Sequence, residues 1–234
     1  MGRRPPVPGG LGPYGASQVV LVVGLAWVAK RPGSVILHAM AADTPELDPS
    51  LPQRRFGWRN MFVAPDEDPR CSAPTLGELA TLTGYLDAYR QTMELKCQGL
   101  DPEQMARRSV PPSDMSLLGL VRHMADVERY WFRQVLAGED SARHFGANGD
   151  WDAAFRDVAP SASAVEQAWS LLRGEVEFAQ GLLAGNPDLD RTGTMRDGQP
   201  VEWREVLVHM IEEYASHCGH ADLIRERIDG RVGQ

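Results

Sequence analysis

Four side chains that can bind a metal ion lie close together near the C-terminal end of the chain. They are His209, Glu213, His217 and His220. The first three follow one another at intervals of four residues, so in a helix they would lie on one face, one turn apart. Two ligands from this row and a third from a neighbouring helix would leave a coordination position open for water or substrate, as in catalytic metal sites. The spacing therefore predicts a reactive metal site if another helix supplies that third ligand.

His123 is the best candidate for the third ligand. It lies three residues after Leu120 and four before Val127, on the apolar face of an expected helix. A single histidine on such a face is more often a packed core residue than a ligand. A second group of metal-binding residues elsewhere in the chain shifts the balance towards a ligand, because the two groups can meet in one cavity.

Spacing alone leaves open which residues of the row would bind the metal. A buried Glu213 carboxylate would cost on the order of several kcal/mol unless it is paired or metal-bound, so it has the weaker structural explanation. His209 fits three roles equally well: a ligand, a partner of a ligand, or a helix-surface residue. His220 lies three residues after His217 and is expected to line the pocket. Two imidazole nitrogens and one carboxylate oxygen suit Zn²⁺, and Ni²⁺, Fe²⁺ or Co²⁺ would also bind.

Four amphipathic helical segments must position these side chains. Heptad-like apolar spacing and helix-ending glycines place them at residues 75–98, 116–136, 163–185 and 201–228. Capping boxes at Thr75 and Ser163 mark the start of the first and third segments, and Asp197-Gly198 marks a tight turn before the fourth. Because strand signals are few, the sequence predicts an all-α four-helix bundle, which can hold a metal site between facing helices.

The first 70 residues are expected to form a poorly structured extension, with the bundle domain at residues 71–234. Ten of the 17 prolines lie in this extension, which lacks helical or strand periodicity. Its apolar run, Val19 to Val28, is shorter than the ~20 residues that cross a bilayer. A secretory signal is the alternative, with Ala39-Met-Ala41 as a cleavage site. We favour a dispensable extension and a cytoplasmic protein.

Composition argues for small-molecule partners. A formal net charge of -8 disfavours nucleic acid, and no segment is suited to a membrane. The three cysteines are odd in number and far apart, which indicates a reducing compartment rather than a disulfide framework. Arg122, Arg129 and Arg225 could bind a substrate carboxylate, although solvated helix-surface arginines are the favoured interpretation. A homodimer stays open as an assembly state.

Two segments carry a resemblance to a known family. Residues 110–132, with the sequence VPPSDMSLLGLVRHMADVERYWF, and the row from His209 to His220 resemble the DinB/YfiT-like superfamily, in particular its actinobacterial mycothiol S-transferase branch. The resemblance covers residues 75–230. It implies a four-helix bundle whose divalent metal is held by His123, Glu213 and His217, a set similar to that of the mycothiol-dependent maleylpyruvate isomerases. Under this alignment His209 falls outside the ligand set.

The resemblance also implies a reaction. The metal would activate a low-molecular-weight thiol, mycothiol in the first instance, for attack on an electrophile that no motif identifies. Two other classes of function stay open. One is a non-catalytic protein that binds a metal or small molecule, and the other is a hydrolase that uses metal-bound hydroxide.

Overall fold

The computed structural model describes residues 51–52, 63, 68–70, 76–146, 150–185 and 187–232. The predictions made for Val19 to Val28, for the signal-like segment around residue 40 and for Thr75 therefore fall outside the described residues. Within the described part, no helix combines the length and apolar character needed to cross a membrane.

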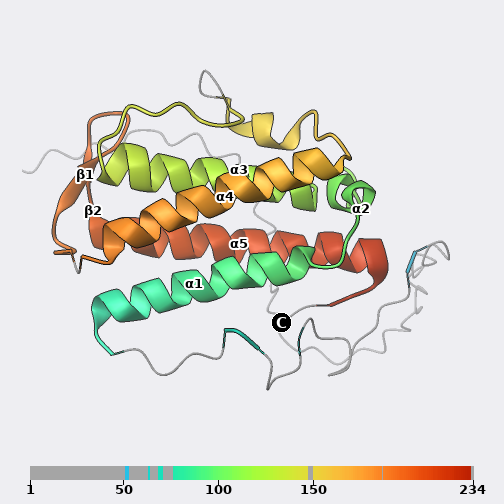
Figure 1. Cartoon of the computed structure of the whole chain (residues 1–234), viewed down its shortest axis with the longest axis horizontal. Coiled ribbons are helices and arrows are strands. Elements are labelled where there is room, and N and C mark those ends of the chain that lie inside the picture. The colour runs from blue at the N-terminus through green and yellow to red at the C-terminus, as the bar shows by residue number, and fades with distance from the viewer. Residues whose placement is uncertain are drawn as a thin grey trace, which may run out of the picture. The chain divides into compact units, whose positions relative to one another are not determined.

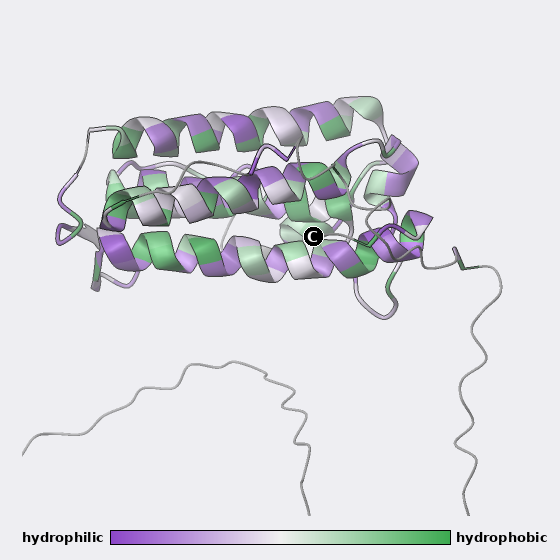
Figure 2. Cartoon of the chain, turned by 90° about the horizontal axis from the view of Figure 1, so that it is seen from below, coloured by the Kyte–Doolittle hydropathy of each residue, from purple (hydrophilic) through white to green (hydrophobic). Residues whose placement is uncertain are grey.

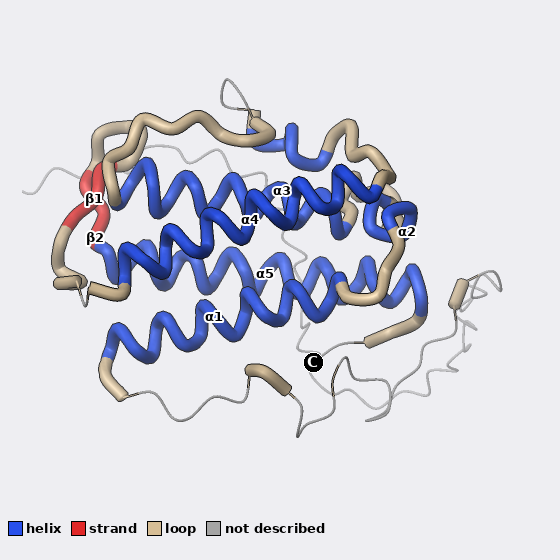
Figure 3. Tube along the Cα trace, in the orientation of Figure 1, coloured by secondary structure: helices blue, strands red, loops and turns tan. Residues whose placement is uncertain are grey.

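The described residues form an all-α four-helix bundle, as the sequence predicted (Figure 1). The long helices are α1 (Glu78–Cys97), α3 (Leu117–Glu128), α4 (Ala162–Leu183) and α5 (Trp203–Asp229), and the π-helix η2 (Arg129–Leu136) continues α3. Two short helices, α2 (Pro102–Ala106) and η4 (Trp151–Phe155), lie in the connections. Figure 3 shows how far the helices dominate over the single small hairpin.

The bundle is held together by three helix pairings. Helix α1 packs along α5, α4 packs along α3, and α3 and α5 contact each other. Apolar and polar residues alternate in patches around each helix, which is the amphipathic pattern that such pairing requires (Figure 2). The largest fully buried apolar side chains come from all the paired helices except α4, among them Leu86, Met93, Leu120, Met124, Phe132, Leu207 and Tyr214.

The helix ends were predicted in part. Ser116 caps α3 by accepting a hydrogen bond from the Gly119 amide, as expected, and the predicted stops at Gly99, Gly138 and Gly230 all have positive φ. The predicted cap at Ser163 is wrong. Ser161 accepts the capping bond from the Ala164 amide instead, because two serines two residues apart offer the same chemistry.

The first helix also begins differently from its prediction. Gly77, with φ of 92°, occupies the N-cap position of α1, and no side chain caps the helix there. The Glu78 carboxylate, expected in a capping box, instead accepts a hydrogen bond from Arg204 at the start of α5. This ion pair connects the start of α1 to the start of α5.

The sequence did not predict the β-hairpin that precedes α5. Strand β1 (Thr192–Thr194) pairs with β2 (Pro200–Glu202) in antiparallel register, with Gly193 opposite Val201. The tight turn predicted at Asp197-Gly198 is confirmed between the strands. The prediction that the last helix starts at Val201 is wrong, since Val201 belongs to β2 and α5 starts at Trp203.

The hairpin passes directly over the end of η2. A Cβ on Gly193 would lie 2.4 Å from the Val135 carbonyl oxygen, so only glycine permits this approach. Three-residue strands are too short to show the alternation by which strands are recognised in a sequence.

Candidate metal centre

The structure brings together the three residues that the resemblance implied as ligands. His123 comes from the middle of α3, whereas Glu213 and His217 lie one turn apart on α5. One possible donor atom from each of the three lies within 4.8 Å of the others, in the only such group of histidine, cysteine and acidic residues among the described part of the chain. The rings of His123 and His217 meet edge to face, with centroids 4.7 Å apart.

The separations between donor atoms fit a zinc-sized ion. The Glu213 Oε2 atom lies 3.4 Å from His217 Nε2 and 3.9 Å from His123 Nε2. Two donors bound to one tetrahedral zinc at about 2.0–2.1 Å would lie roughly 3.3 Å apart. The separation between Glu213 and His217 is thus already close to the value for two bound donors, and the separation between Glu213 and His123 exceeds it by about half an ångström.

Glu213 lies among three histidines that lower the pKa of its carboxyl group. Hydrogen bonds from His123, His209 and His217 hold the pKa of its carboxyl well below the usual value, against the opposing effect of burial. The carboxylate is therefore ionised at any physiological pH. A charged oxygen between two imidazoles is the donor set that divalent transition metals prefer.

His209 and His220, expected at the margins of the pocket, each contact one of these residues. His209 Nε2 lies 3.2 Å from the second oxygen of Glu213, Oε1, and this bond raises the pKa of His209. His220 Nδ1 lies 3.3 Å from His217 Nδ1. Burial, and the neighbouring His217, lower the pKa of His220.

Aromatic side chains form the walls beside these histidines. The Phe155 ring of η4 lies 5.2 Å from the His123 ring, and the Trp131 ring of η2 lies 4.6 Å from the His209 ring. A Cβ on Gly119 would lie 3.0 Å from Phe155 Cδ1, so the glycine one turn before His123 lets η4 approach α3 closely. The contact between Trp131 and His209 is one that the sequence did not indicate.

The three arginines considered for substrate binding all bond to the protein itself. Arg122 donates to the Arg156 carbonyl, and Arg129 donates to Glu175 and to the Ala142 carbonyl. The favoured interpretation of Arg225 as a solvated surface residue is wrong. Its side chain is buried, and it donates to the last carbonyls of α1 and to Asp229. Such side chains complete helix ends that lack their own partners.

His144 belongs to a partly buried polar cluster around Glu175 of α4. Its Nε2 atom lies 3.0 Å from Glu175 Oε1, and Arg129 and Arg133 donate to the same carboxylate. Burial of Glu175 opposes its ionisation, but the bonds from His144 and the two arginines lower its pKa to about 2. This cluster fixes α4 against η2 and has no contact with the three candidate ligands.

The described cysteines are unsuited to act as nucleophiles. Cys97 and Cys218 are free and buried, and burial raises the pKa of each thiol to about 12. Neither would be ionised at neutral pH, so neither offers a thiolate for reaction or for metal binding.

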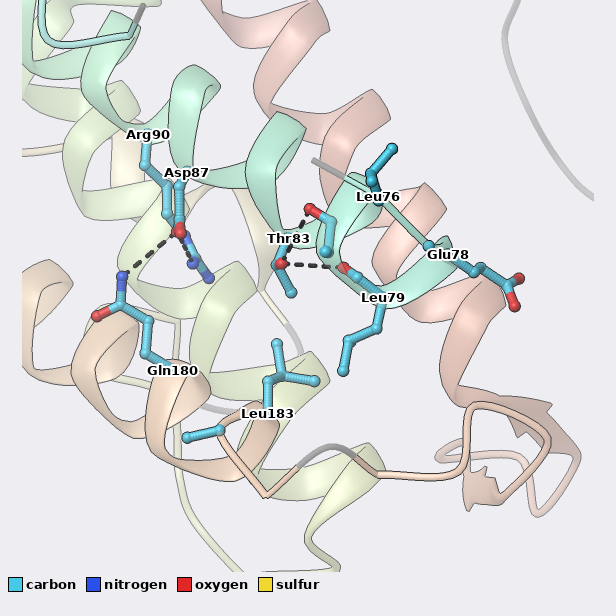
Figure 4. A pocket seen from close by; sticks show the side chains of 11 residues that line it. Leu76, Glu78, Leu79, Thr83, Asp87, Arg90, Gln180 and Leu183 are labelled. Carbon is cyan, nitrogen blue, oxygen red and sulfur yellow. Dashed lines mark hydrogen bonds and ion pairs between the residues drawn. The ribbon is translucent and has the colours of Figure 1, made fainter. Parts of the chain in front are cut away.

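The three best-formed hollows of the described structure lie along the groove between α1 and α4. The largest, of about 580 Å³, is shown in Figure 4 and is lined mainly by residues from the N-terminal half of α1 and the C-terminal part of α4. Arg90 lies at its inner end, where the guanidinium pairs with the buried Glu128 carboxylate. The linings of these hollows do not include His123, Glu213 or His217. The candidate metal centre is therefore separate from these three hollows.

Comparison with known proteins gives one family. A family model described as Mycothiol-S-transferase matches residues 81–230, a span that contains all three candidate ligands and the helices from α1 to α5 except the first turn of α1. No curated protein matches the chain.

Proposed function

Because the chain belongs to the mycothiol-S-transferase family, we propose that it transfers mycothiol to an electrophilic small molecule at a divalent metal centre. The observation that supports the metal dependence is the convergence of His123, Glu213 and His217 from two helices. We propose these three residues as the ligands and zinc as the metal, with Ni²⁺, Fe²⁺ or Co²⁺ as substitutes.

In the proposed reaction a sulfur–carbon bond forms and the thiol S–H bond breaks. The leaving group departs from the electrophilic carbon with its bonding electrons, and the thiol proton passes to solvent. When bound, the divalent ion supplies positive charge that favours the thiolate, the reactive form of a thiol. Three protein donors would leave at least one coordination position of a bound ion for a small molecule.

The two cysteines in the described part of the chain, Cys97 and Cys218, support an external thiol as the nucleophile. With pKa values near 12, Cys97 and Cys218 would be protonated at neutral pH. Their free state also agrees with a reducing compartment, and we propose the cytoplasm as the location. The catalytic unit is proposed to be residues 71–234, with residues 1–70 dispensable for the reaction.

The test is a conjugation assay with mycothiol and a chlorodinitrobenzene, followed by the absorbance of the thioether product. We expect turnover that a chelator abolishes and that added Zn²⁺ restores, while glutathione at the same concentration reacts more slowly. A His123→Ala variant serves as the matched control, since it removes one proposed ligand and leaves Glu213 and His217 of α5 unchanged.

Two results would overturn the proposal in different ways. Stoichiometric metal without thiol-dependent turnover across several electrophiles would make the protein a binding protein. Chelator-sensitive cleavage of an ester or amide with no added thiol would make it a hydrolase.

A further inference from the structure

Beside each of the two proposed ligands on α5, Glu213 and His217, lies a histidine of the same helix that is outside the proposed ligand set. His209 lies one turn before Glu213, and His220 lies one turn after His217. Both contacts are made by the ligand atom that faces away from the other proposed ligands. This arrangement suggests that the four residues work as two pairs.

The first pair is His209 and Glu213. The two carboxylate oxygens are divided: Oε2 faces His123 and His217, whereas Oε1 lies 3.2 Å from His209 Nε2. A proton on His209 Nε2 would therefore face the oxygen that the metal would not use. A carboxylate held at one oxygen can no longer rotate, so its other oxygen stays directed at the imidazoles.

Trp131 limits the movement of His209 in turn. Its ring lies 4.6 Å from the His209 ring, although the His209 side chain is 38 % exposed. An unrestrained histidine on a helix surface would exchange rotamers freely, and the ring contact reduces that freedom. The π-helix η2 carries Trp131, and π-helical turns are frequent next to functional sites.

The second pair is His217 and His220. Their Nδ1 atoms lie 3.3 Å apart, so one of them must donate and the other accept. If His217 Nε2 binds a metal, the proton of the neutral ring is on Nδ1, and His217 is the donor. His220 then accepts at Nδ1 and carries its own proton on Nε2. The contact thus selects the His217 tautomer whose Nε2 lone pair faces Glu213.

We propose that His209 and His220 are positioning residues that fix the orientation of the metal ligands Glu213 and His217. The inference rests on the metal centre of the proposed function and adds a role for two residues outside the ligand set. His123 differs from these two ligands, because its ring lies against Phe155 and not against a histidine outside the proposed ligand set. Removal of such partners of a ligand typically weakens metal binding by about 10–100-fold.

The test measures metal binding by the full-length protein rather than turnover. The variants are His209→Ala and His220→Ala, with His209→Gln and His220→Asn as conservative replacements. Glutamine can place an amide donor near the Nε2 position, and asparagine can place an acceptor near the Nδ1 position. Ser216→Ala is the matched control, since Ser216 is an exposed residue of the same helix next to His217.

Zinc affinity is measured by competition with a chromophoric chelator, and Co²⁺ absorption reports the geometry of the bound ion. We expect both alanine variants to bind zinc about 10–100-fold more weakly, with unchanged stoichiometry at saturation and an altered Co²⁺ spectrum. The conservative variants should recover most of the affinity and the wild-type spectrum, and Ser216→Ala should match the wild type. Thermal melting of the metal-free proteins identifies any variant that fails to fold.

Three outcomes are decisive. Alanine variants with wild-type affinity and Co²⁺ spectrum would overturn the positioning role. Equal losses in the alanine and conservative variants would also overturn it, because the hydrogen bond would then be irrelevant. Wild-type protein that binds no metal would overturn both this inference and the proposed function, whereas metal binding without thiol transfer would overturn only the latter.

Discussion

At the scale of single residues, Glu213 determines how the cluster is organised. It contacts three imidazoles, and its two oxygens sort them into a pair beside Oε2 and the single His209 beside Oε1. This division is what separates a proposed ligand from a proposed positioning residue. A histidine on the Oε1 side can be replaced without loss of a donor atom, whereas a histidine on the Oε2 side cannot.

The distinction predicts different metal contents for three variants. His123→Ala and His217→Ala should lose stoichiometric metal, because each leaves only two of three donors. His209→Ala should keep metal at saturation, since its donor set is intact. Elemental analysis of the purified variants, loaded with excess Zn²⁺ and then desalted, checks this. A metal-free His209 variant beside a loaded His217 variant would show that the ligand set is wrong.

The sequence predicted the meeting of these residues better than their individual contacts. Helical spacing was enough to put Glu213 and His217 on one face, and His123 on an apolar face that had to turn inward. The role of His209 could not follow from spacing, because it depends on which carboxylate oxygen it contacts and on a tryptophan from another helix. The burial of Arg90, Lys96 and Arg225 was not predicted for the same reason, because their partners lie far away in the sequence.

At the scale of elements, Glu175 connects α4 to η2 and to the loop that carries His144. Its folded-state pKa, near 2, lies below the ordinary 4.5, so the cluster stabilises the fold above pH 4.5 and loses this contribution as the pH falls towards 2. Glu175→Gln should therefore lower the free energy of unfolding at neutral pH by roughly 2 kcal/mol, allowing for solvent screening around the arginines.

Urea unfolding of the wild type and the Glu175→Gln variant at several pH values checks this prediction. The difference between the two proteins should narrow between pH 4.5 and about 2, because protonation then removes the same charge from the wild type. Other carboxylates titrate in both proteins, so the difference isolates Glu175. A gap that stays constant across this range would show that the charge of Glu175 contributes nothing to stability.

Element boundaries were predictable only where one local signal acted alone. Glycines with positive φ ended three helices where expected, since no other residue competes for that conformation. The π-helix was not foreseeable. Its hydrogen bonds join residues five apart instead of four, such as Ala137 N–H to the Phe132 carbonyl, and over eight residues this leaves the apolar pattern nearly unchanged. The hairpin depends on the close approach of Gly193 to Val135, which is a tertiary contact.

At the scale of the whole molecule, four long amphipathic helices with little strand leave few architectures other than a bundle. The candidate metal ligands lie where α3 and α5 meet, and both helices belong to the span matched by the family model. The buried Arg90, Glu128 and Tyr214 connect α1, α3 and α5 through hydrogen bonds inside the same bundle. The two helices that carry the proposed ligands, α3 and α5, are therefore also held together by these buried hydrogen bonds.

This concentration of contacts predicts that residues 71–234 form an active unit. A fragment starting at Cys71 loses the hydrogen bond from Arg70 to Thr92, which is worth about 1 kcal/mol, but keeps every residue of the bundle core and the metal cluster. We expect cooperative thermal unfolding and a zinc affinity equal to that of the full chain. A fragment starting at Leu47, where the compact unit containing the described residues begins, is the matched control because it retains Arg70. Both fragments should bind zinc alike, with the shorter one melting slightly earlier. If only the longer fragment folds, residues 47–70 belong to the domain and the proposed boundary at residue 71 is wrong.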